Sequence, residues 1–130
     1  MNALNKKRNA ELEQERGRAA LRQAEILHQS KEYDGAVSRA YYAIFHYARA
    51  ALFLRGFETK SHSGLSSLFN LHFVRTGLLE KKFAAMLSNA QKAREESDYE
   101  PEIPFTEEES AERVNDAKAF LEKIESVFKE

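Results

Sequence analysis

The sequence predicts an all-α protein, an up-and-down bundle of four long helices and one short helix. Helix-forming residues dominate the 130-residue chain, which contains only 5 Gly and 2 Pro. Apolar residues recur at helical spacing in several segments, and the connections between these segments are short. A hydrophobic content of 42% with 32% charged residues is typical of a folded domain and excludes a wholly disordered chain.

The first predicted helix runs from about Leu12 to Gln29 and is highly charged. Its sparse apolar stripe consists of Ala20, Leu21, Ala24 and Leu27. The residues before this stripe offer little to bury, so we expect residues 1–15 to form a charged, frayed N-terminal arm. Residues 16–130 are then expected to form a single helical domain. Short polar residues from Ser30 to Gly35 indicate a turn after the first helix.

The segment from Ala36 to Arg55 is apolar over most of its circumference. One face carries Ala36, Ala40, Ala43, Tyr47, Ala50, Ala51 and Leu54, and further apolar residues widen it. A helix of this kind is buried by several neighbours, and its alanines allow them to approach closely. We therefore predict that this segment is the central helix of the bundle, ended by Gly56.

The rest of the chain predicts three more helices. They are a short helix from about Gly64 to Arg75, a long one from about Leu79 to Asp98, and a last one that ends near Phe128. Both prolines lie in the connection Tyr99–Phe105, which must be a loop. Thr106 with Glu109 forms the capping-box pattern that starts the last helix.

Composition excludes several classes of protein and of site. The chain has no cysteine, which excludes disulfides, zinc–thiolate sites and a thiol nucleophile. The four histidines show no metal-ligand spacing, so we expect neither a metal nor another cofactor. No apolar run approaches the roughly 20 residues of a membrane span, and no apolar segment follows the basic N-terminus, so a cytoplasmic protein is expected. A net charge of -1 argues against general nucleic-acid binding but leaves a local positive patch open.

The polar stripe of the central helix is the main candidate site. Arg39, Tyr42, His46 and Arg49 lie within an arc of about 80°. Arg39 and His46 are about 10 Å apart along the axis, so together they could bracket one phosphate group. The structural alternative is that both arginines pair with acidic residues of the first or last helix and that His46 is a partly buried spacer.

Four segments in order resemble the HEPN family of small bacterial and archaeal proteins. They are Ser38 to His46 (SRAYYAIFH), Lys60 to Gly64 (KSHSG), Phe73 to Gly77 (FVRTG) and Arg94 to Tyr99 (REESDY). The resemblance covers about residues 20–128. It implies a helical bundle that usually dimerises and that is associated with nucleotides or RNA. Such proteins are often encoded beside a minimal nucleotidyltransferase, as toxin–antitoxin pairs.

Many HEPN proteins are metal-independent ribonucleases with an arginine and a histidine separated by four to six residues. Arg39 and His46 have six residues between them. The resemblance implies that His46 acts as general base on a ribose 2′-hydroxyl and that Arg39 stabilises charge on the scissile phosphate. The chain departs from the nuclease members in having Ala40 where a polar residue usually follows the arginine. Their motif also tends to lie on a late helix, where this chain has Arg94 and then Tyr99 in place of a histidine.

Four residues outside the stripe are weaker candidates for ligand binding. Lys60 and His62 precede a helix whose N-terminus favours an anion, although Ser61 or Ser63 could simply cap that helix. Arg94 could orient Tyr99 toward a ligand, or it could form an ordinary ion pair with the residue one turn later.

Two functions remain open at this point. The first is a nucleotide- or RNA-binding HEPN protein of a toxin–antitoxin or related defence pair, with metal-independent endoribonuclease activity as its sharper form. The second is a non-catalytic dimeric module that binds a nucleotidyltransferase partner. We expect a homodimer in both cases, because so apolar a set of helices often leaves a face to bury.

Overall fold

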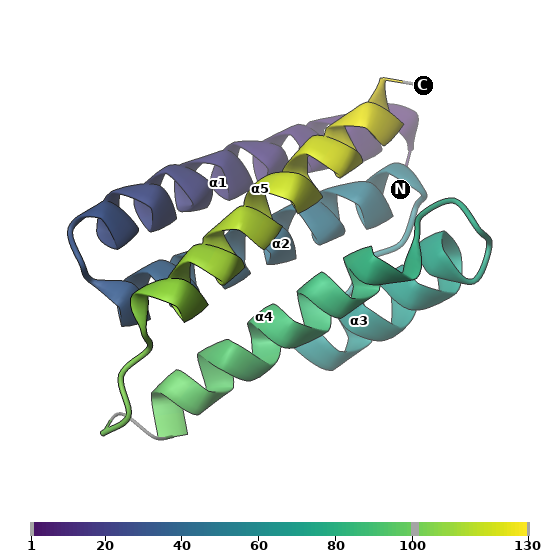
Figure 1. Cartoon of the computed structure of the whole chain (residues 1–130). Coiled ribbons are helices and arrows are strands. Elements are labelled where there is room, and N and C mark those ends of the chain that lie inside the picture. Colours follow the sequence, from purple (N-terminus) through teal and green to yellow (C-terminus); the bar gives the residue numbers. More distant parts are fainter. Residues whose placement is uncertain (1, 100–101, 130) are drawn as a thin grey trace.

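Helix α2 (Tyr33–Leu54) lies at the centre of the fold, and more than half of its residues are buried. Around it pack the other helices, α1 (Ala3–Gln29), α3 (His62–Phe69), α4 (Lys81–Tyr99) and α5 (Glu107–Phe128). Figure 1 shows α1 and α2 running in opposite directions, as do α4 and α5. The predicted all-α class and the central position of the alanine-rich helix are thus confirmed.

The computed structural model describes residues 2–99 and 102–129, without the side chains of Asp98 and Tyr99. Within these residues every regular element is helical. None of the described helices is long and apolar enough to cross a membrane.

Helix α1 begins earlier than the sequence pattern predicts. It starts at Ala3, capped by the side chain of Asn2, and not near Leu12. Its buried residues are Ala10, Glu13, Gly17, Ala20 and Ala24, which follow one another at spacings of three and four. These side chains are small or charged, so the buried face of the helix carries little apolar signal. The division of the chain into an arm (1–15) and a domain (16–130) stays a prediction.

The segment after the central helix also differs in detail from the prediction. Helix α3 begins at His62, two residues before the predicted start, and Ser61 caps it by accepting a hydrogen bond from the Gly64 amide at 2.9 Å. It continues into a π-helical turn, Asn70–Val74. The structural alternative for Ser61, a helix cap, is therefore the one observed.

Helix α5 starts as its sequence predicts. Thr106 and Glu109 form both hydrogen bonds of the capping box, each 3.1 Å long. Three glutamates in the first turn face the positive end of the helix dipole. The connection from α4 is held to the central helix where Asp34 accepts a hydrogen bond from the Phe105 amide at 2.9 Å.

Helices α1 and α2 are in close contact at Gly17. A Cβ atom at this position would lie only 2.4 Å from Cδ1 of Tyr47, whose side chain is fully buried. The Tyr47 hydroxyl donates to Glu125 at 2.5 Å and accepts from Arg18 at 3.1 Å. Burial and the Glu125 carboxylate raise the pKa of Tyr47 to about 12, which keeps this hydroxyl protonated. The side chain of Tyr47 is thus held by partners from α1 and α5, and Gly17 provides the space for its ring.

Replacement of Gly17 by alanine is expected to destabilise the protein. Helix propensity alone would stabilise the variant by about 1 kcal/mol. The overlap with Tyr47 opposes this, and we expect Gly17→Ala to lower the free energy of unfolding by about 1–3 kcal/mol in urea titrations. Gly35→Ala is the matched control, because its Cβ would meet only the flexible end of Leu27 at 3.2 Å. A Gly17→Ala variant more stable than the wild type would contradict this packing.

Candidate functional site

The predicted polar stripe of α2 opens onto a groove between α1 and α2. Arg39, Tyr42 and His46 line this groove on the α2 side. The α1 side consists of Arg16, Ala19, Ala20 and Gln23. The groove has a volume of about 380 Å³, within the usual range for ligand sites of about 300–1,000 Å³. Its walls carry two arginines and a histidine, groups that suit a phosphate.

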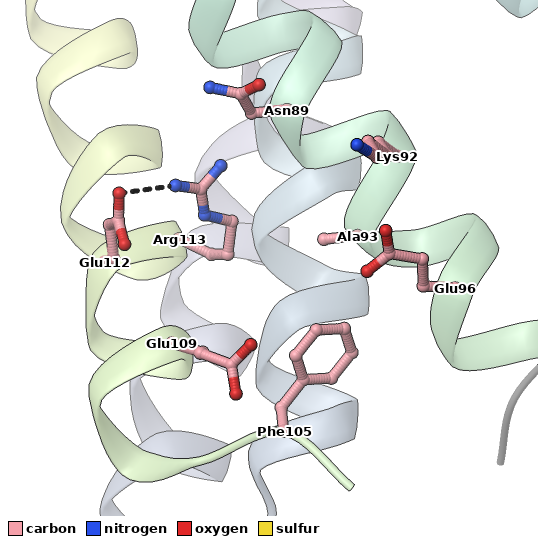
Figure 2. Close-up of a pocket in the computed structure, with 8 residues that line it drawn as sticks. All are labelled: Asn89, Lys92, Ala93, Glu96, Phe105, Glu109, Glu112 and Arg113. Carbon is pink, nitrogen blue, oxygen red and sulfur yellow. Dashed lines mark ion pairs between the residues drawn. The ribbon is translucent and has the colours of Figure 1, made fainter. Parts of the chain in front are cut away.

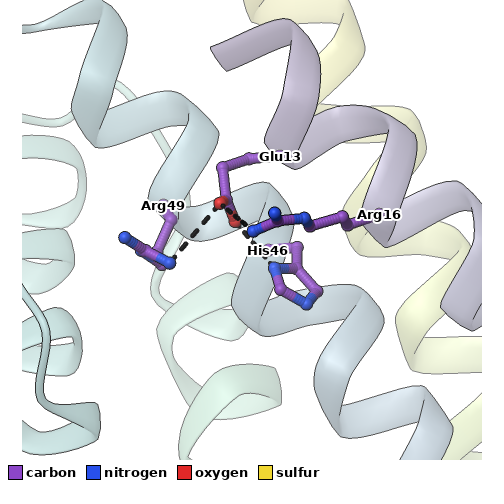
Figure 3. Close-up of polar contacts among 4 residues, drawn as sticks. All are labelled: Glu13, Arg16, His46 and Arg49. Atoms are coloured by element: carbon purple, nitrogen blue, oxygen red, sulfur yellow. Dashed lines mark hydrogen bonds and ion pairs between the residues drawn. The ribbon is translucent and has the colours of Figure 1, made fainter. Parts of the chain in front are cut away.

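A buried carboxylate contacts two of the residues that line this groove. Glu13 of α1 is only 6% exposed in its side chain, and three basic residues surround it. His46 Nδ1 lies 2.7 Å from one carboxylate oxygen, and the Arg16 and Arg49 guanidinium groups lie 3.3 and 3.4 Å from the other. Figure 3 shows the three basic side chains converging on Glu13 from two helices. We call Glu13, Arg16, His46 and Arg49 the Glu13 cluster.

The environment of Glu13 fixes the orientation of His46. Burial raises the pKa of Glu13, but the hydrogen bond from His46 and the charge of Arg49 outweigh it, so the pKa lies below its usual value. An ionised carboxylate only accepts hydrogen bonds, and Nδ1 of His46 must therefore carry the hydrogen. The other ring nitrogen, Nε2, points away from Glu13 (Figure 3). With His46 19% exposed and lining the groove, Nε2 is the atom available for proton transfer.

Arg49 belongs to the Glu13 cluster and does not line the groove. Its guanidinium carbon lies 5.7 and 5.3 Å from the ring centroids of Phe45 and Phe53. Its Nε is buried without a hydrogen-bond partner in the part of the chain that the structure describes. Arg49 therefore acts here mainly as a counter-charge for Glu13. The structural alternative predicted this kind of pairing with an acidic residue for the arginines.

An aromatic cluster joins the stripe to helices α3 and α4. His62 Nδ1 is hydrogen-bonded to the hydroxyl of Tyr41, and the His62 ring lies 4.9 Å from that of Phe45. Burial and the charge of Arg94 lower the pKa of His62, while burial raises the pKa of Tyr41 far above its usual range. The Tyr41 hydroxyl therefore donates to a neutral His62. Arg94 lies 5.3 Å from the centroid of the Tyr42 ring.

The remaining sequence candidates are Lys60 and Tyr99. Lys60 is exposed in the loop before α3. The side chain of Tyr99 lies outside the described residues, as does that of Asp98, the residue one turn after Arg94. The structure thus brings Arg39, Tyr42 and His46 together in the groove.

A second pocket, between α4 and α5, has a different character. It has a volume of about 220 Å³, and its lining residues include Lys92, Glu96, Glu109, Glu112 and Arg113 (Figure 2). Arg113 is already paired with Glu112 at 2.8 Å and Asp116 at 3.5 Å. Acidic side chains outnumber basic ones, so a phosphate would meet repulsion in this pocket.

Comparison with known proteins is in line with these features. A family model described as the HEPN domain matches residues 10–127, nearly the whole chain. This chain belongs to the HEPN family.

Several curated HEPN relatives are similar over most of their length. A Methanocaldococcus jannaschii protein named "Putative toxin MJ0605" is 37% identical over 82% of this chain and 79% of its own. A second protein of that organism, named "Putative toxin MJ0142", is 32% identical over 90% of this chain and 80% of its own. A Thermotoga maritima protein named "UPF0332 protein" is 31% identical over 88% and 87%. The chain is thus similar to HEPN proteins of which two carry the name of a putative toxin.

Glu13 and Arg16 are the residues of this HEPN site that sequence reasoning missed. Glu13 lies in the segment predicted as a frayed arm. Its signal was its place in the series of small residues from Ala10 to Ala24, which marks the face of α1 turned toward α2. In the part of the HEPN chain that the structure describes, no group of three His, Asp or Glu side chains could hold a metal ion.

The charge on Glu13 should stabilise the HEPN fold in a pH-dependent way. We expect Glu13→Gln to lower the free energy of unfolding at pH 7 by about 1.5–3 kcal/mol, because hydrogen bonds to a charged group are lost. The folded pKa lies below the usual 4.5, so the stabilisation is present above this value and disappears as the pH falls through the folded pKa. Denaturation of both proteins from pH 7 to pH 3 measures this convergence.

Glu11→Gln is the matched control, since Glu11 is exposed on the same helix. It should change the free energy of unfolding by no more than about 0.5 kcal/mol. A difference between Glu13→Gln and the wild type that persists unchanged at low pH would show that the carboxylate charge is not the stabilising feature.

Proposed function

We propose that this HEPN protein binds RNA in the groove between α1 and α2 and cleaves it without a metal ion. In this proposal His46 is the general base and Arg39 stabilises the phosphate. The observation that carries it is the hydrogen bond from His46 to the buried carboxylate of Glu13. It fixes one tautomer and leaves Nε2 for the groove. The same pairing of a carboxylate with an imidazole orients the base of many hydrolytic sites.

In the proposed cleavage step these groups have separate roles. His46 Nε2 takes the proton of a ribose 2′-hydroxyl, and the 2′ oxygen forms a bond to the adjacent phosphorus. The bond from phosphorus to the 5′ oxygen breaks, and this oxygen takes a proton from water in the open groove. The products are a 2′,3′-cyclic phosphate and a 5′-hydroxyl. Arg39 and Arg16, both exposed at the groove, neutralise charge on the phosphate oxygens as it develops.

Local charge supports phosphate binding although the chain as a whole has a net charge of -1. Arg16 is 64% exposed in its side chain, and Arg39 is also exposed. The nearby carboxylate of Glu13 is buried and already paired with His46, Arg49 and Arg16 itself. A phosphate that approaches the groove therefore meets positive groups first.

One observation favours the second candidate, a non-catalytic interaction module. Ala40, at the position where the nuclease members usually carry a polar residue, is fully buried in the core. The side chain that follows Arg39 therefore cannot contribute to a phosphate site. In this alternative the chain would dimerise and bind a nucleotidyltransferase partner, and the polar stripe would be structural or would sense a nucleotide without cleaving RNA.

An RNA cleavage assay in EDTA distinguishes the two candidates. The wild type is expected to cleave RNA and to leave 2′,3′-cyclic phosphate ends. His46→Ala should lower the rate about 10²- to 10⁴-fold, because the general base is lost. Arg39→Ala should lower it about 10²- to 10³-fold, because charge on the phosphate is no longer neutralised. Glu13→Gln should lower kcat more than it changes KM, because a neutral amide holds His46 and stabilises its protonated form less well than a carboxylate does.

His72→Ala and Arg75→Ala are the matched controls for this assay. His72 stacks on Phe57 away from the groove, and Arg75 is exposed after the π-helical turn. Both should cleave at the wild-type rate. Equal inactivity of the wild type and all variants, with RNA binding retained, would reject the ribonuclease and leave the binding module.

The names of the relatives support a role in a toxin–antitoxin pair. We propose a nucleotidyltransferase-type protein as the partner and a homodimer as the state of this chain. Exposed leucines in α2, in the π-helical turn and in the loop after it offer apolar surface for such contacts; they are Leu54, Leu71 and Leu78. The charged groove would remain outside these contacts.

Light scattering at micromolar concentration tests the homodimer. We expect a mass of twice the 14.9 kDa chain, because apolar surface is removed from water on association. The double variant Leu71→Glu with Leu78→Glu should shift this mass toward that of the monomer. A wild-type protein that is monomeric at these concentrations would contradict the proposal.

A further inference from the structure

We propose that Tyr42 is a stacking platform for an unpaired nucleobase of the RNA strand, and that it makes this site selective for single-stranded RNA. This inference rests on the proposed function of the groove and adds a residue that determines its specificity. The platform would hold the base next to the phosphate that Arg39 and His46 bind.

The position of Tyr42 in the groove is the first argument. Its ring is partly exposed and lines the groove midway along the stripe, three residues after Arg39 and four before His46. One helical turn is about 5.4 Å, so the ring lies within about 6 Å of either residue along the axis. A base and its own phosphate are separated by a similar distance, which allows both to be held at once.

The second argument is that neighbouring rings hold Tyr42 in place. Tyr41 meets it edge-on at 5.2 Å and Phe45 edge-on at 6.4 Å, measured between ring centroids. Tyr41 is completely buried, so the ring that Tyr42 packs against is part of the core. A platform fixed in this way loses little conformational entropy when a base stacks on it.

The third argument concerns the two cations beside the ring. The guanidinium carbons of Arg39 and Arg94 each lie 5.3 Å from the Tyr42 centroid. Arg39 is exposed, and its hydrogen bond to Gln23 is long at 3.5 Å. It can therefore leave the ring for a phosphate, and a base can take its place. The combination of an aromatic ring with flanking arginines is the usual way in which proteins bind single strands.

Selectivity follows from the geometry of stacking. The bases of a duplex are stacked on one another and paired, so their faces are not available to a side chain. An unpaired strand can turn a base onto Tyr42 without first losing pairing energy. A free mononucleotide could use the same ring and arginine but would lack the next phosphate of a strand, which we place at Arg16.

Binding of a non-cleavable oligonucleotide tests the proposal. The probe is a fluorescein-labelled 2′-O-methyl RNA of about 12 nucleotides, used unpaired or annealed to its complement, with anisotropy read at one fixed salt concentration. The unpaired strand should bind at least 10-fold more tightly than the duplex. Tyr42→Leu, which keeps apolar volume, should weaken binding of the unpaired strand roughly 5- to 150-fold, the usual range for loss of one stacked base. Tyr42→Phe keeps the ring and should bind within about twofold of the wild type.

Tyr33→Leu is the matched control, because Tyr33 is a partly buried tyrosine of the same helix that packs beside His28 away from the groove. It should bind as the wild type does, and thermal unfolding of each variant confirms that it is folded. Wild-type affinity in Tyr42→Leu, or equal affinity for strand and duplex, would overturn the stacking role and leave the cleavage proposal intact. Competition by adenosine monophosphate as strong as that by the oligonucleotide would overturn the single-strand specificity. Absence of any RNA binding by the wild type would overturn both proposals.

Discussion

The geometry of the site depends on the pairing of the buried Glu13 carboxylate with His46 and Arg49. An unpaired ion in this place would cost several kcal/mol of desolvation, and His46 and Arg49 on the neighbouring helix offset that cost. They can do so only because α1 lies close to α2, an approach that Gly17 permits. The packing of α1 against α2 at Gly17 and Tyr47 therefore also places Glu13 beside the imidazole of His46. Fold and site cannot vary independently in this molecule.

Much of the fold could be predicted from the sequence, because apolar periodicity is strong in α2 and the capping box marks the start of α5. The stripe from Arg39 to Arg49 could be predicted for a simpler reason, since it lies on one helix. Glu13 could not be predicted in the same way. The hydrogen bond between Glu13 and His46 joins residues 33 positions apart in the sequence, and the face of α1 around Glu13 is built from alanine and glycine. Small residues bring helices together without leaving a hydrophobic pattern to detect.

The placement of charge also explains how a chain with a slight negative net charge can present a phosphate site. Acidic side chains gather at the start of α5 and around the pocket between α4 and α5. Arg16 and Arg39 line the other groove, and the nearby carboxylate of Glu13 is buried and paired. Because fields of exposed charges are screened within about 8 Å at physiological salt, the two surfaces act separately. Whole-chain charge says little about such a site.

The early start of α1 has a practical consequence for protein engineering. A shortened chain beginning at residue 16 keeps every residue of the polar stripe and most of the apolar core. It nevertheless lacks Ala10, which packs near Ala50 and Phe53, and it lacks the carboxylate that holds His46. Trimming of the N-terminus, by a protease or by a cloning decision, would leave a helical protein whose imidazole is free to rotate. Loss of function in such a product would say nothing about the groove itself.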